Sequence, residues 1–426
     1  MYLHFLSIVL LINAFPPGHT ENSPSAVDQT VKSRPTIRHN SDGSTEYVLL
    51  IVTDLDRESK ADNWTWRAVT RQGRLTLNLN GRKPQVKITW DSEKNLTSNM
   101  NVKGRAMELS DLSVFHNRIL TPDDRTGMIS EIKGDNIIPW VFLNSGPGNT
   151  TDAFKCEWMT IKDDLLYVGS HGNEFKGKVT HKNNMWVKTV TPRGEVTNLN
   201  WINVYDRMQA AAGISAQGYL THEAVQWSKI QNRWFFLPRK ASNTSYVELE
   251  DETKGTNLLI SSPDLKHFDF VTVGRQFPKR GYSAFDGSGR RFKIVGFSYP
   301  GKHRTLAMSR QWSKIQNRWF FLPRKASNTS YVELEDETKG TNLLISSPDL
   351  KHFDFVTVGR QFPKRGYSAF DFIPGTNDEL IVALKSTEVT GESTASFITV
   401  FNISGQVVLK DQRLDGDYKF EGLYFI

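Results

Sequence analysis

A long internal repeat constrains what this chain can fold into. Gln226–Asp286 recurs without a single change as Gln311–Asp371, which duplicates 61 residues at an offset of 85. Repeat units that evolve as blades or solenoid turns drift apart in sequence, so perfect identity indicates a recent duplication or an error in gene assembly. The fold must therefore seat the same strands twice, or carry one copy and the spacer Gly287–Arg310 as a surplus insert.

The duplication also accounts for the basic charge of the chain, which is formally +7. The spacer and the second copy, Gly287–Asp371, hold 15 Lys and Arg against 7 Asp and Glu, so they contribute +8 and the remainder −1. This distribution favours a near-neutral protein with a basic insert over a protein that binds nucleic acid or membranes through its net charge.

The first residues have the character of a signal peptide. Phe5–Phe15 is mostly apolar, too short for a typical membrane span, and followed by polar residues from His19. We expect a signal peptide over 1–20, a flexible polar leader over 21–45, and a secreted protein without membrane contact after cleavage. Six Asn-X-Ser/Thr triplets favour a secreted glycoprotein; they begin at Asn63, Asn95, Asn149, Asn243, Asn328 and Asn402.

The only cysteine, Cys156, excludes an intrachain disulfide and a thiolate zinc cluster. A large secreted domain with a good hydrophobic core does not need a disulfide. We expect Cys156 to be a buried apolar residue, and the alternative is a bridge to another chain.

Short β-prone segments bounded by turn residues follow one another from residue 46 onward. They include Tyr47–Val52, Arg74–Leu79, Gln85–Trp90, Ile137–Leu143, Leu165–Val168, Met185–Val190, Asn257–Ser261 and Glu379–Leu384. Only Asn203–Ile214 has a helical pattern. So many short strands indicate a sandwich, a barrel or a propeller. An echo between Glu108-Leu-Ser-Asp-Leu and Glu157-Trp-Met-Thr-Ile, 49 residues apart, corresponds to about one four-stranded blade and favours the propeller.

Acidic residues gather in two places that could carry chemistry. Asp54, Asp56 and Glu58 follow an apolar strand, where burying unpaired carboxylates would be costly. They are either a solvated loop or a group that orients water and a hydrated cation near phosphates. Glu108 and Asp111, with Asp123-Asp124-Arg125, form a second set. These residues could make structural ion pairs or hold a metal ion and a polyphosphate.

Two other motifs do not support a site. Gly172–Lys178 has the spacing of a phosphate-binding loop, but Val179 stands where the magnesium-binding Ser or Thr belongs and no helix is expected after it. No HExxH pattern occurs, and His222 is expected to pack or donate a hydrogen bond rather than bind metal.

Nine ordered motifs resemble the calcium-activated nucleotidase family, which includes the salivary apyrases of blood-feeding arthropods. The similarity runs from about Tyr47 to Ile426 and is interrupted only by the extra 85 residues. The motifs are TDLDRES from Thr53, GRAMELSDL from Gly104, DDRTG from Asp123, FKCEW from Phe154, AAAGISAQGYLTHE from Ala210, WFFLPRKAS from Trp234, KGTNLL from Lys254, FIPGTNDELIVALKS from Phe372 and YKFEGLYFI from Tyr418.

The resemblance implies a five-bladed β-propeller over 46–426 with one calcium ion in its central tunnel. The implied calcium ligands are Ser110, Glu157, Glu223, Ser283 or its duplicate Ser368, and Glu421. Calcium prefers six to eight oxygen ligands in flexible geometry. The implied catalytic residues are Asp54, Asp56, Glu58, Glu108, Asp111, Asp124 and Arg125, and the implied substrate-binding residues are Arg57, Arg239 and Lys254.

The resemblance further implies a secreted apyrase that hydrolyses nucleoside tri- and diphosphates by direct attack of water, without a phosphoenzyme. Asp54 or Asp56 is expected to orient the water, and calcium with Arg125 or Arg239 to balance the phosphate charge. The alternative is a non-catalytic calcium-binding propeller with a protein or glycan partner. In a blood feeder the enzyme would be salivary and would remove ADP.

Five blades would leave no seat for a second copy of the same strands. We therefore expect one copy in the ring and the other, with the spacer, loosely attached. The rival is a six-bladed ring, which the spacer does not favour because it supplies no convincing strands of its own.

Overall fold

A computed structural model describes residues 35–109, 111–176, 180–229, 231–247, 254–256, 258–272, 309–313, 315–325, 337–349, 352–389 and 391–426. The chain divides into two units, 1–31 and 32–426. The first unit, which contains the predicted signal peptide, lies outside the described residues. The predicted ligands Ser110 and Ser283 also lie outside them, as does nearly all of the spacer.

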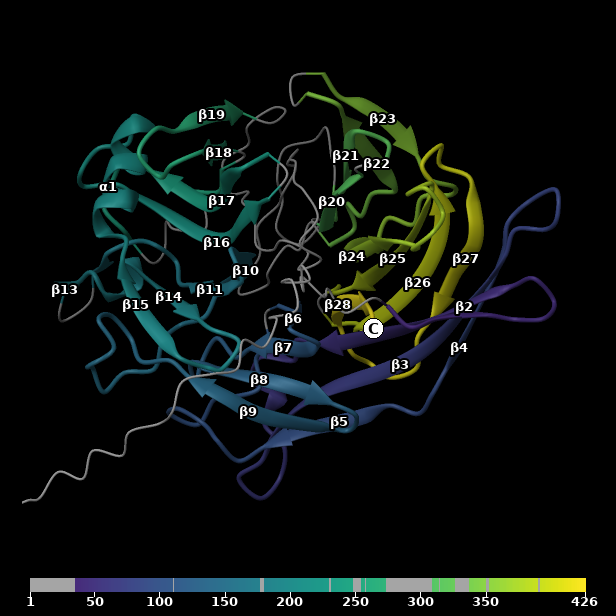
Figure 1. The fold of residues 1–426 in the computed structure, drawn as a ribbon, viewed down its shortest axis with the longest axis horizontal. Coiled ribbons are helices and arrows are strands. Elements are labelled where there is room, and N and C mark those ends of the chain that lie inside the picture. Colours follow the sequence, from purple (N-terminus) through teal and green to yellow (C-terminus); the bar gives the residue numbers. More distant parts are fainter. Residues whose placement is uncertain are drawn as a thin grey trace, which may run out of the picture. The chain divides into compact units, whose positions relative to one another are not determined.

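The second unit consists of antiparallel sheets arranged as the blades of a propeller (Figure 1). Four blades run from the innermost strand outward in chain order, each strand pairing with the next. Blade 1 is β6 Ser113–Phe115, β7 Arg118–Pro122, β8 Met128–Lys133 and β9 Asn136–Phe142. Blade 3 is β16 Tyr219–Ser228, β17 Arg233–Ser242, β18 Leu258–Ser262 and β19 Asp269–Thr272. Blade 4 is β20 Ser309–Ser313, β21 Arg318–Leu322, β22 Leu343–Ser347 and β23 Asp354–Thr357. Blade 5 is β24 Gly366–Phe372, β25 Leu380–Thr387, β26 Ala395–Asn402 and β27 Val407–Arg413.

Blade 2 has the same order with small additions. Its strands are β10 Trp158–Lys162, β11 Leu165–Gly169, β14 Trp186–Val190 and β15 Val196–Asn200. Between β11 and β14 come the two-residue strands β12 Phe175–Lys176 and β13 Thr180–His181 and the 3₁₀ turn η2 Asn183–Met185. The helix α1 Ile202–Ala211 follows β15, close to the predicted 203–214, and it buries Tyr205 and Met208.

Blade 6 joins the two ends of the described chain. Its innermost strand is the last one, β28 Phe420–Phe425, which pairs with β2 Thr45–Thr53. The rest of the sheet is β3 Trp66–Asn78, whose outer edge pairs first with β5 Lys94–Ser98, along 66–70, and then with β4 Gln85–Trp90, along 73–78. β1 Ile37–His39 pairs with the start of β2. The turn η1 Asp56–Ser59 follows β2. Pairing of the last strand with an early one closes the ring.

Among the described residues, six hydrophobic clusters hold the ring together, one between each pair of neighbouring blades. Side chains alternate between the two faces of a strand, so each blade presents one apolar face to the blade before it and one to the blade after it. In β17, Trp234 packs in the cluster shared with blade 2, and Phe235 packs in the cluster shared with blade 4. Cys156 is buried in the cluster between blades 1 and 2, as predicted.

The prediction of five blades is wrong, because the ring has six. Both copies of the repeat supply strands: the first copy forms β17–β19, and the second forms β21–β23 and most of β24. The second copy is therefore packed rather than loosely attached in the residues described. The physical reason is that a blade with two apolar faces can be repeated, since each repeat adds an interface of the kind already present.

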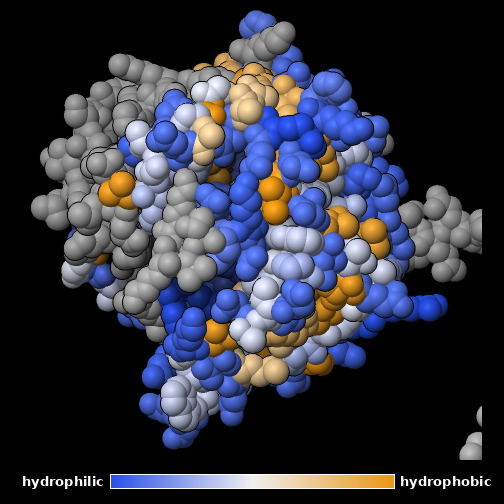
Figure 2. Space-filling view, turned by 90° about the vertical axis from the view of Figure 1, so that its left-hand side faces the viewer, coloured by the Kyte–Doolittle hydropathy of each residue, from blue (hydrophilic) through white to orange (hydrophobic). Residues whose placement is uncertain are grey.

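The outer strands leave some apolar side chains exposed, among them Phe355 in β23 and Val407 in β27. Figure 2 shows one face of the molecule, on which hydrophilic residues predominate and hydrophobic residues lie in small groups between them.

We predict that Trp319→Ala and Trp234→Ala, the same substitution in the two copies, destabilise the protein to a similar degree. Both side chains are nearly fully buried, and loss of a buried tryptophan costs about 3–5 kcal/mol. Urea unfolding measures the effect, with Ile315→Ala at an exposed position of the second copy as the control. A Trp319→Ala protein as stable as the control would mean that the second copy is not packed.

Candidate functional site

The antiparallel order of the strands brings charged residues to one end of the propeller. In each complete blade the innermost strand starts, and the second strand ends, at the same end of the sheet. We call this the site end. In the chain it comprises the segments just before β6, β10 and β28, the starts of β16 and β24, and the segments just after β2, β7, β11 and β25. Most of the predicted site residues lie in these segments.

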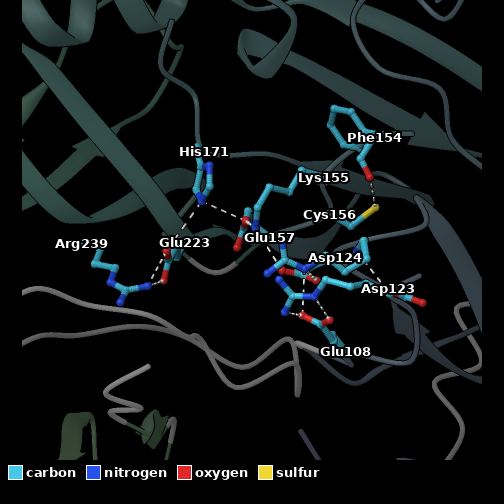
Figure 3. Close-up of polar contacts among 12 residues, drawn as sticks. Glu108, Asp123, Asp124, Phe154, Lys155, Cys156, Glu157, His171, Glu223 and Arg239 are labelled. Atoms are coloured by element: carbon cyan, nitrogen blue, oxygen red, sulfur yellow. Dashed lines mark hydrogen bonds and ion pairs between the residues drawn. The ribbon is translucent and has the colours of Figure 1, made fainter. Parts of the chain in front are cut away.

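A continuous network of ion pairs crosses the site end of blades 1, 2 and 3 (Figure 3). In blade 1, the Glu108 carboxylate accepts hydrogen bonds from Arg105 Nη2 at 2.6 Å and from Arg125 Nε at 2.8 Å. Arg125 Nε also lies 3.1 Å from Asp124 Oδ1. Lys155, just before β10, donates to Asp124 Oδ2 at 3.0 Å and to Glu157. The lysine therefore links blade 1 to blade 2.

The network continues from blade 2 to blade 3. His171 Nε2 lies 2.9 Å from Glu157 Oε1 and 3.7 Å from Glu223 Oε1. Arg239 in β17 donates from Nη1 to both Glu223 oxygens, at 2.7 and 2.9 Å. Glu223 lies at an irregularity of β16, where the pairing with β17 shifts on both sides of His222. Acids and bases thus alternate along the whole network.

Burial makes this pairing necessary, because an unpaired buried carboxylate is costly. The side chains of Glu157 and Glu223 are each only 9% exposed. Burial alone would raise the pKa of Glu157, but the neighbouring His171 and Lys155 outweigh it and hold that pKa well below its usual value. Burial opposes the charged form of His171, yet Glu157 raises its pKa above the usual range. Each partner therefore favours the charged form of the other.

Glu157, His171 and Glu223 could together hold a metal ion, since their ligand atoms lie within 4.8 Å of one another. The two carboxylates fit a hard cation such as calcium, which prefers oxygen ligands. Lys155 and Arg239 hold the positive charge beside these carboxylates. The structure thus brings together two of the predicted calcium ligands.

The predicted ligand Glu421 is not one of the three residues of this group, and the predicted ligand Ser368 contacts blade 6. Ser368 in β24 is buried, and its Oγ donates to the Phe420 carbonyl oxygen at 2.9 Å. The Glu421 carboxylate contacts Lys419, whose Nζ lies 3.5 Å from Glu388 Oε1. Blade 4 comes between the blades of Glu223 and Ser368 in the ring, so the extra blade separates the two parts of the predicted ligand set.

Asp111 has a structural role in addition to any role in the site. Its Oδ1 accepts a hydrogen bond from its neighbour Leu112 N at 2.8 Å, and its Oδ2 accepts one from Met159 N in blade 2 at 3.3 Å. Burial raises the pKa of Asp111 to about 7, although these two hydrogen bonds act in the opposite direction. Asp123 is similar, with Met107 N donating to Oδ2 at 2.8 Å and Arg125 N to Oδ1 at 3.0 Å.

The first acidic segment lies on the loop from β2 to β3. Asp54 is half-buried at the end of β2, and Glu58 is exposed in η1. The side chains of Asp56 and Arg57 lie outside the described residues. Ser59 Oγ donates to the Ala106 carbonyl oxygen at 2.8 Å, which fixes this loop beside the segment of Glu108. Lys254 lies in the connection between β17 and β18, and its carbonyl oxygen accepts a hydrogen bond from Ala241 N at the end of β17, at 2.8 Å.

Sequence reasoning missed Lys155, His171 and Arg105. Lys155 lies within the FKCEW motif two residues before Glu157, so the motif itself contained the signal. His171 carried no such signal, because only the fold brings it to Glu157 and Glu223. His222 was predicted to pack, and it is fully buried beside Tyr205 and Phe236.

We predict that Asp111→Asn destabilises the protein by about 1–3 kcal/mol, the cost of leaving a buried donor unsatisfied. An asparagine amide group cannot accept hydrogen bonds on both sides, so either Leu112 N or Met159 N loses its partner. Thermal unfolding measures the change, and Asp135→Asn, which alters an exposed pair with Lys94, is the control. Equal midpoints for the two variants would contradict the bridging role.

Comparisons with known proteins identify relatives over most of the chain. The sequence model of the apyrase family matches residues 55–295 and 289–426. Apyrase apy-1 of Caenorhabditis elegans is 35% identical over 394 residues, covering 92% of this chain and 87% of that protein. Soluble calcium-activated nucleotidase 1 of Rattus norvegicus is 34% identical over 389 residues, covering 90% and 75%. An apyrase of Cimex lectularius is 29% identical over 434 residues, covering 100% and 94%. The chain therefore belongs to the apyrase family.

Proposed function

We propose that this protein is a secreted, calcium-dependent apyrase that hydrolyses nucleoside di- and triphosphates, ADP and ATP among them. The observation that carries the proposal is the meeting of Glu157, His171 and Glu223 within a buried network of acids and bases. Relatives named apyrase and soluble calcium-activated nucleotidase support the substrate class and the metal. No helix among the described residues is long and apolar enough to cross a membrane.

In this proposal Glu157 and Glu223 bind the calcium ion, with further oxygen ligands from Ser110, Ser283 or Ser368, and Glu421. Bound calcium would neutralise phosphate charge and polarise the bond to the leaving group. Until the ion binds, Lys155 and Arg239 balance the charge of the two buried carboxylates. Once the ion binds, these two basic side chains become available to phosphate oxygens. Their contacts with the carboxylates are the ones that an incoming dication would replace.

The remaining charged residues bind and orient the substrate. Arg125 lies between Glu108 and Asp124, which fix its guanidinium group at the site end. A guanidinium group suits phosphate recognition because its donors are planar and always charged. We assign the orientation of the attacking water to Asp54 or Asp56, on the loop that Ser59 fixes beside Glu108. No side-chain nucleophile takes part, so water attacks the phosphorus directly.

We predict that ADP hydrolysis requires calcium and that magnesium does not replace it. Calcium accepts irregular sets of oxygen ligands, whereas magnesium demands a near-ideal octahedron. Phosphate release from ADP, ATP, GDP, UDP and AMP with each metal and with a chelator tests this. Full activity in magnesium with a calcium-specific chelator would contradict the prediction, and hydrolysis of none of these nucleotides would favour a binding protein.

We predict that Glu223→Ala or Glu157→Ala abolishes activity together with the rise in unfolding temperature that calcium causes by binding the native state. Asp54→Asn should abolish activity and keep most of that rise, because Asp54 orients water rather than binding the ion. Glu195→Ala, at an exposed position of the loop before β15, is the control. A Glu223→Ala protein with normal turnover and a normal calcium response would refute this division of roles.

A further inference from the structure

A short hairpin leads from η1 into β3, and we call it the 60–66 hairpin. Lys60 and Trp66 form a β-bridge at its base. Thr65 N donates to the Asp62 carbonyl oxygen at 3.2 Å, which closes the turn at its tip. Trp66 anchors the hairpin, because its side chain is fully buried and its Nε1 donates to the Gly104 carbonyl oxygen at 3.1 Å. The tip is therefore held on a fixed base.

The tip consists of Asn63 and Trp64, whose φ angles are both positive, 56° and 54°. Asparagine often adopts this left-handed conformation, whereas a bulky residue such as tryptophan rarely does. The turn leaves Trp64 67% exposed, the largest value among the large hydrophobic residues that the structure describes. Lys60 Nζ lies 5.3 Å from the centroid of the Trp64 ring, and the Trp66 ring lies 5.6 Å away. Single exposed hydrophobic residues are common, so this exposure indicates a partner only together with a second observation.

The second observation is the residue that precedes Trp64. Asn63-Trp64-Thr65 is one of the Asn-X-Thr triplets that accept an N-linked glycan in a secreted chain. Asn63 is exposed. Within the described residues its main-chain carbonyl oxygen accepts a hydrogen bond from Thr65 Oγ1 at 3.3 Å, and its side-chain amide makes none. The triplet therefore places an available amide nitrogen directly beside an exposed indole ring.

The other triplets do not combine these two features within the described residues. In three of them the asparagine amide already takes part in hydrogen bonds; these triplets begin at Asn95, Asn243 and Asn402. The triplet that begins at Asn328 lies outside the described residues. Asn149 is exposed, as Asn63 is, but neither residue that follows it in its triplet is aromatic. Asn149 is therefore the matched control for Asn63.

We propose that Asn63 carries an N-linked glycan and that its first sugar packs on the exposed face of Trp64. One face of an N-acetylglucosamine ring presents C–H groups and is apolar, and an indole ring offers it a large, rigid apolar surface. Because the sugar is attached to the neighbouring residue, the two rings meet at a high effective concentration and with little further loss of freedom. The contact stabilises the tip of the 60–66 hairpin, and it rests on the proposed secretion but not on the proposed hydrolysis.

The modification requires a glycosyl donor, which is a lipid-linked oligosaccharyl diphosphate of the secretory pathway. The bond that forms joins Asn63 Nδ2 to C1 of the first sugar. The bond that breaks joins C1 to an oxygen of the lipid diphosphate, which leaves with the electron pair of that bond. The amide nitrogen gives up one proton, which the diphosphate takes up. No oxidant or reductant takes part.

The first measurement uses the full chain secreted from a eukaryotic cell. Mass spectrometry of glycopeptides gives the occupancy of each triplet, and hydroxyl-radical footprinting gives the solvent accessibility of Trp64. We expect Asn63 to be occupied. We expect Trp64 to be oxidised several-fold more slowly than in the Asn63→Asp variant, which lacks the triplet but keeps a residue that tolerates the left-handed conformation. Phe355, 57% exposed in blade 4, is the control and should react equally in both proteins.

Each other outcome of this measurement contradicts a defined part of the account. Glycans at other triplets with none at Asn63 would overturn this proposal and leave the proposed secretion intact. A chain with no glycan at any triplet would overturn both. An occupied Asn63 beside a Trp64 that is oxidised as fast as in the variant would mean that the glycan extends into solvent, which would overturn the proposed contact.

Thermal unfolding of the same proteins measures whether the contact stabilises the fold. Asn63→Asp is combined with Trp64→Ala in a double-mutant cycle. We expect Asn63→Asp to lower the unfolding temperature by about 1–2 °C when Trp64 is present and to have little effect in the Trp64→Ala protein. Asn149→Asp, which removes the matched triplet, should act equally in both backgrounds.

The same cycle in protein made without glycans should be additive, because only the sugar links the two positions. Additive effects of Asn63→Asp and Trp64→Ala in the glycosylated protein would overturn the proposal. Coupling of the same size in protein without glycans would also overturn it, since the coupling would then come from the turn itself.

Discussion

The alternation of side chains along each strand is the constraint on which the structure depends. It gives every blade two apolar faces, and each face packs against a neighbouring blade. In the segment Arg233-Trp-Phe-Phe-Leu and its copy, tryptophan points to the preceding blade and the following phenylalanine to the next one. Burial of such aromatic surface stabilises the ring. Replacing one buried tryptophan with alanine costs about 3–5 kcal/mol of stability. A duplicated blade can therefore be accommodated, since its faces fit the faces already present.

The same geometry concentrates charge at one end. Inner strands start there and second strands end there, so Glu108, Asp124, Glu157 and Glu223 meet arginine, lysine and histidine from the neighbouring segments. Because these side chains are largely buried, each acid requires a positive partner. Lys155 and Arg239 supply it in the structure, and a divalent cation with a phosphorylated substrate would take over these contacts in the proposed reaction. The ion pairs that stabilise the site are thus the contacts that a bound cation and substrate would replace.

Much of this was predictable from local pattern. The strands Gln85–Trp90 and Leu165–Val168, a helix near 203–214 and the burial of Cys156 follow from residue types. The meeting of Glu157 with Glu223 at one site was implied by the family resemblance that the ordered motifs carry. The number of blades was not predictable in this way. It depends on whether two identical segments can pack on each other, and that is decided by the apolar faces of the two blades together. The separation of Glu421 from Glu223 follows from that number. His171 was missed because only the fold brings it to Glu157 and Glu223. Asp111 proved to bridge blades 1 and 2 through backbone N–H groups.

The central claim is that the carboxylates of Glu157 and Glu223 bind one calcium ion at the site end. Anomalous diffraction from crystals of the full chain grown with calcium tests it most directly. The account predicts a peak within about 2.3–2.6 Å of an oxygen of each carboxylate, the usual calcium–oxygen distance, with Lys155 and Arg239 moved away from them. A crystal that contains calcium elsewhere, with Lys155 still bound to Glu157 and Arg239 still bound to Glu223, would contradict it.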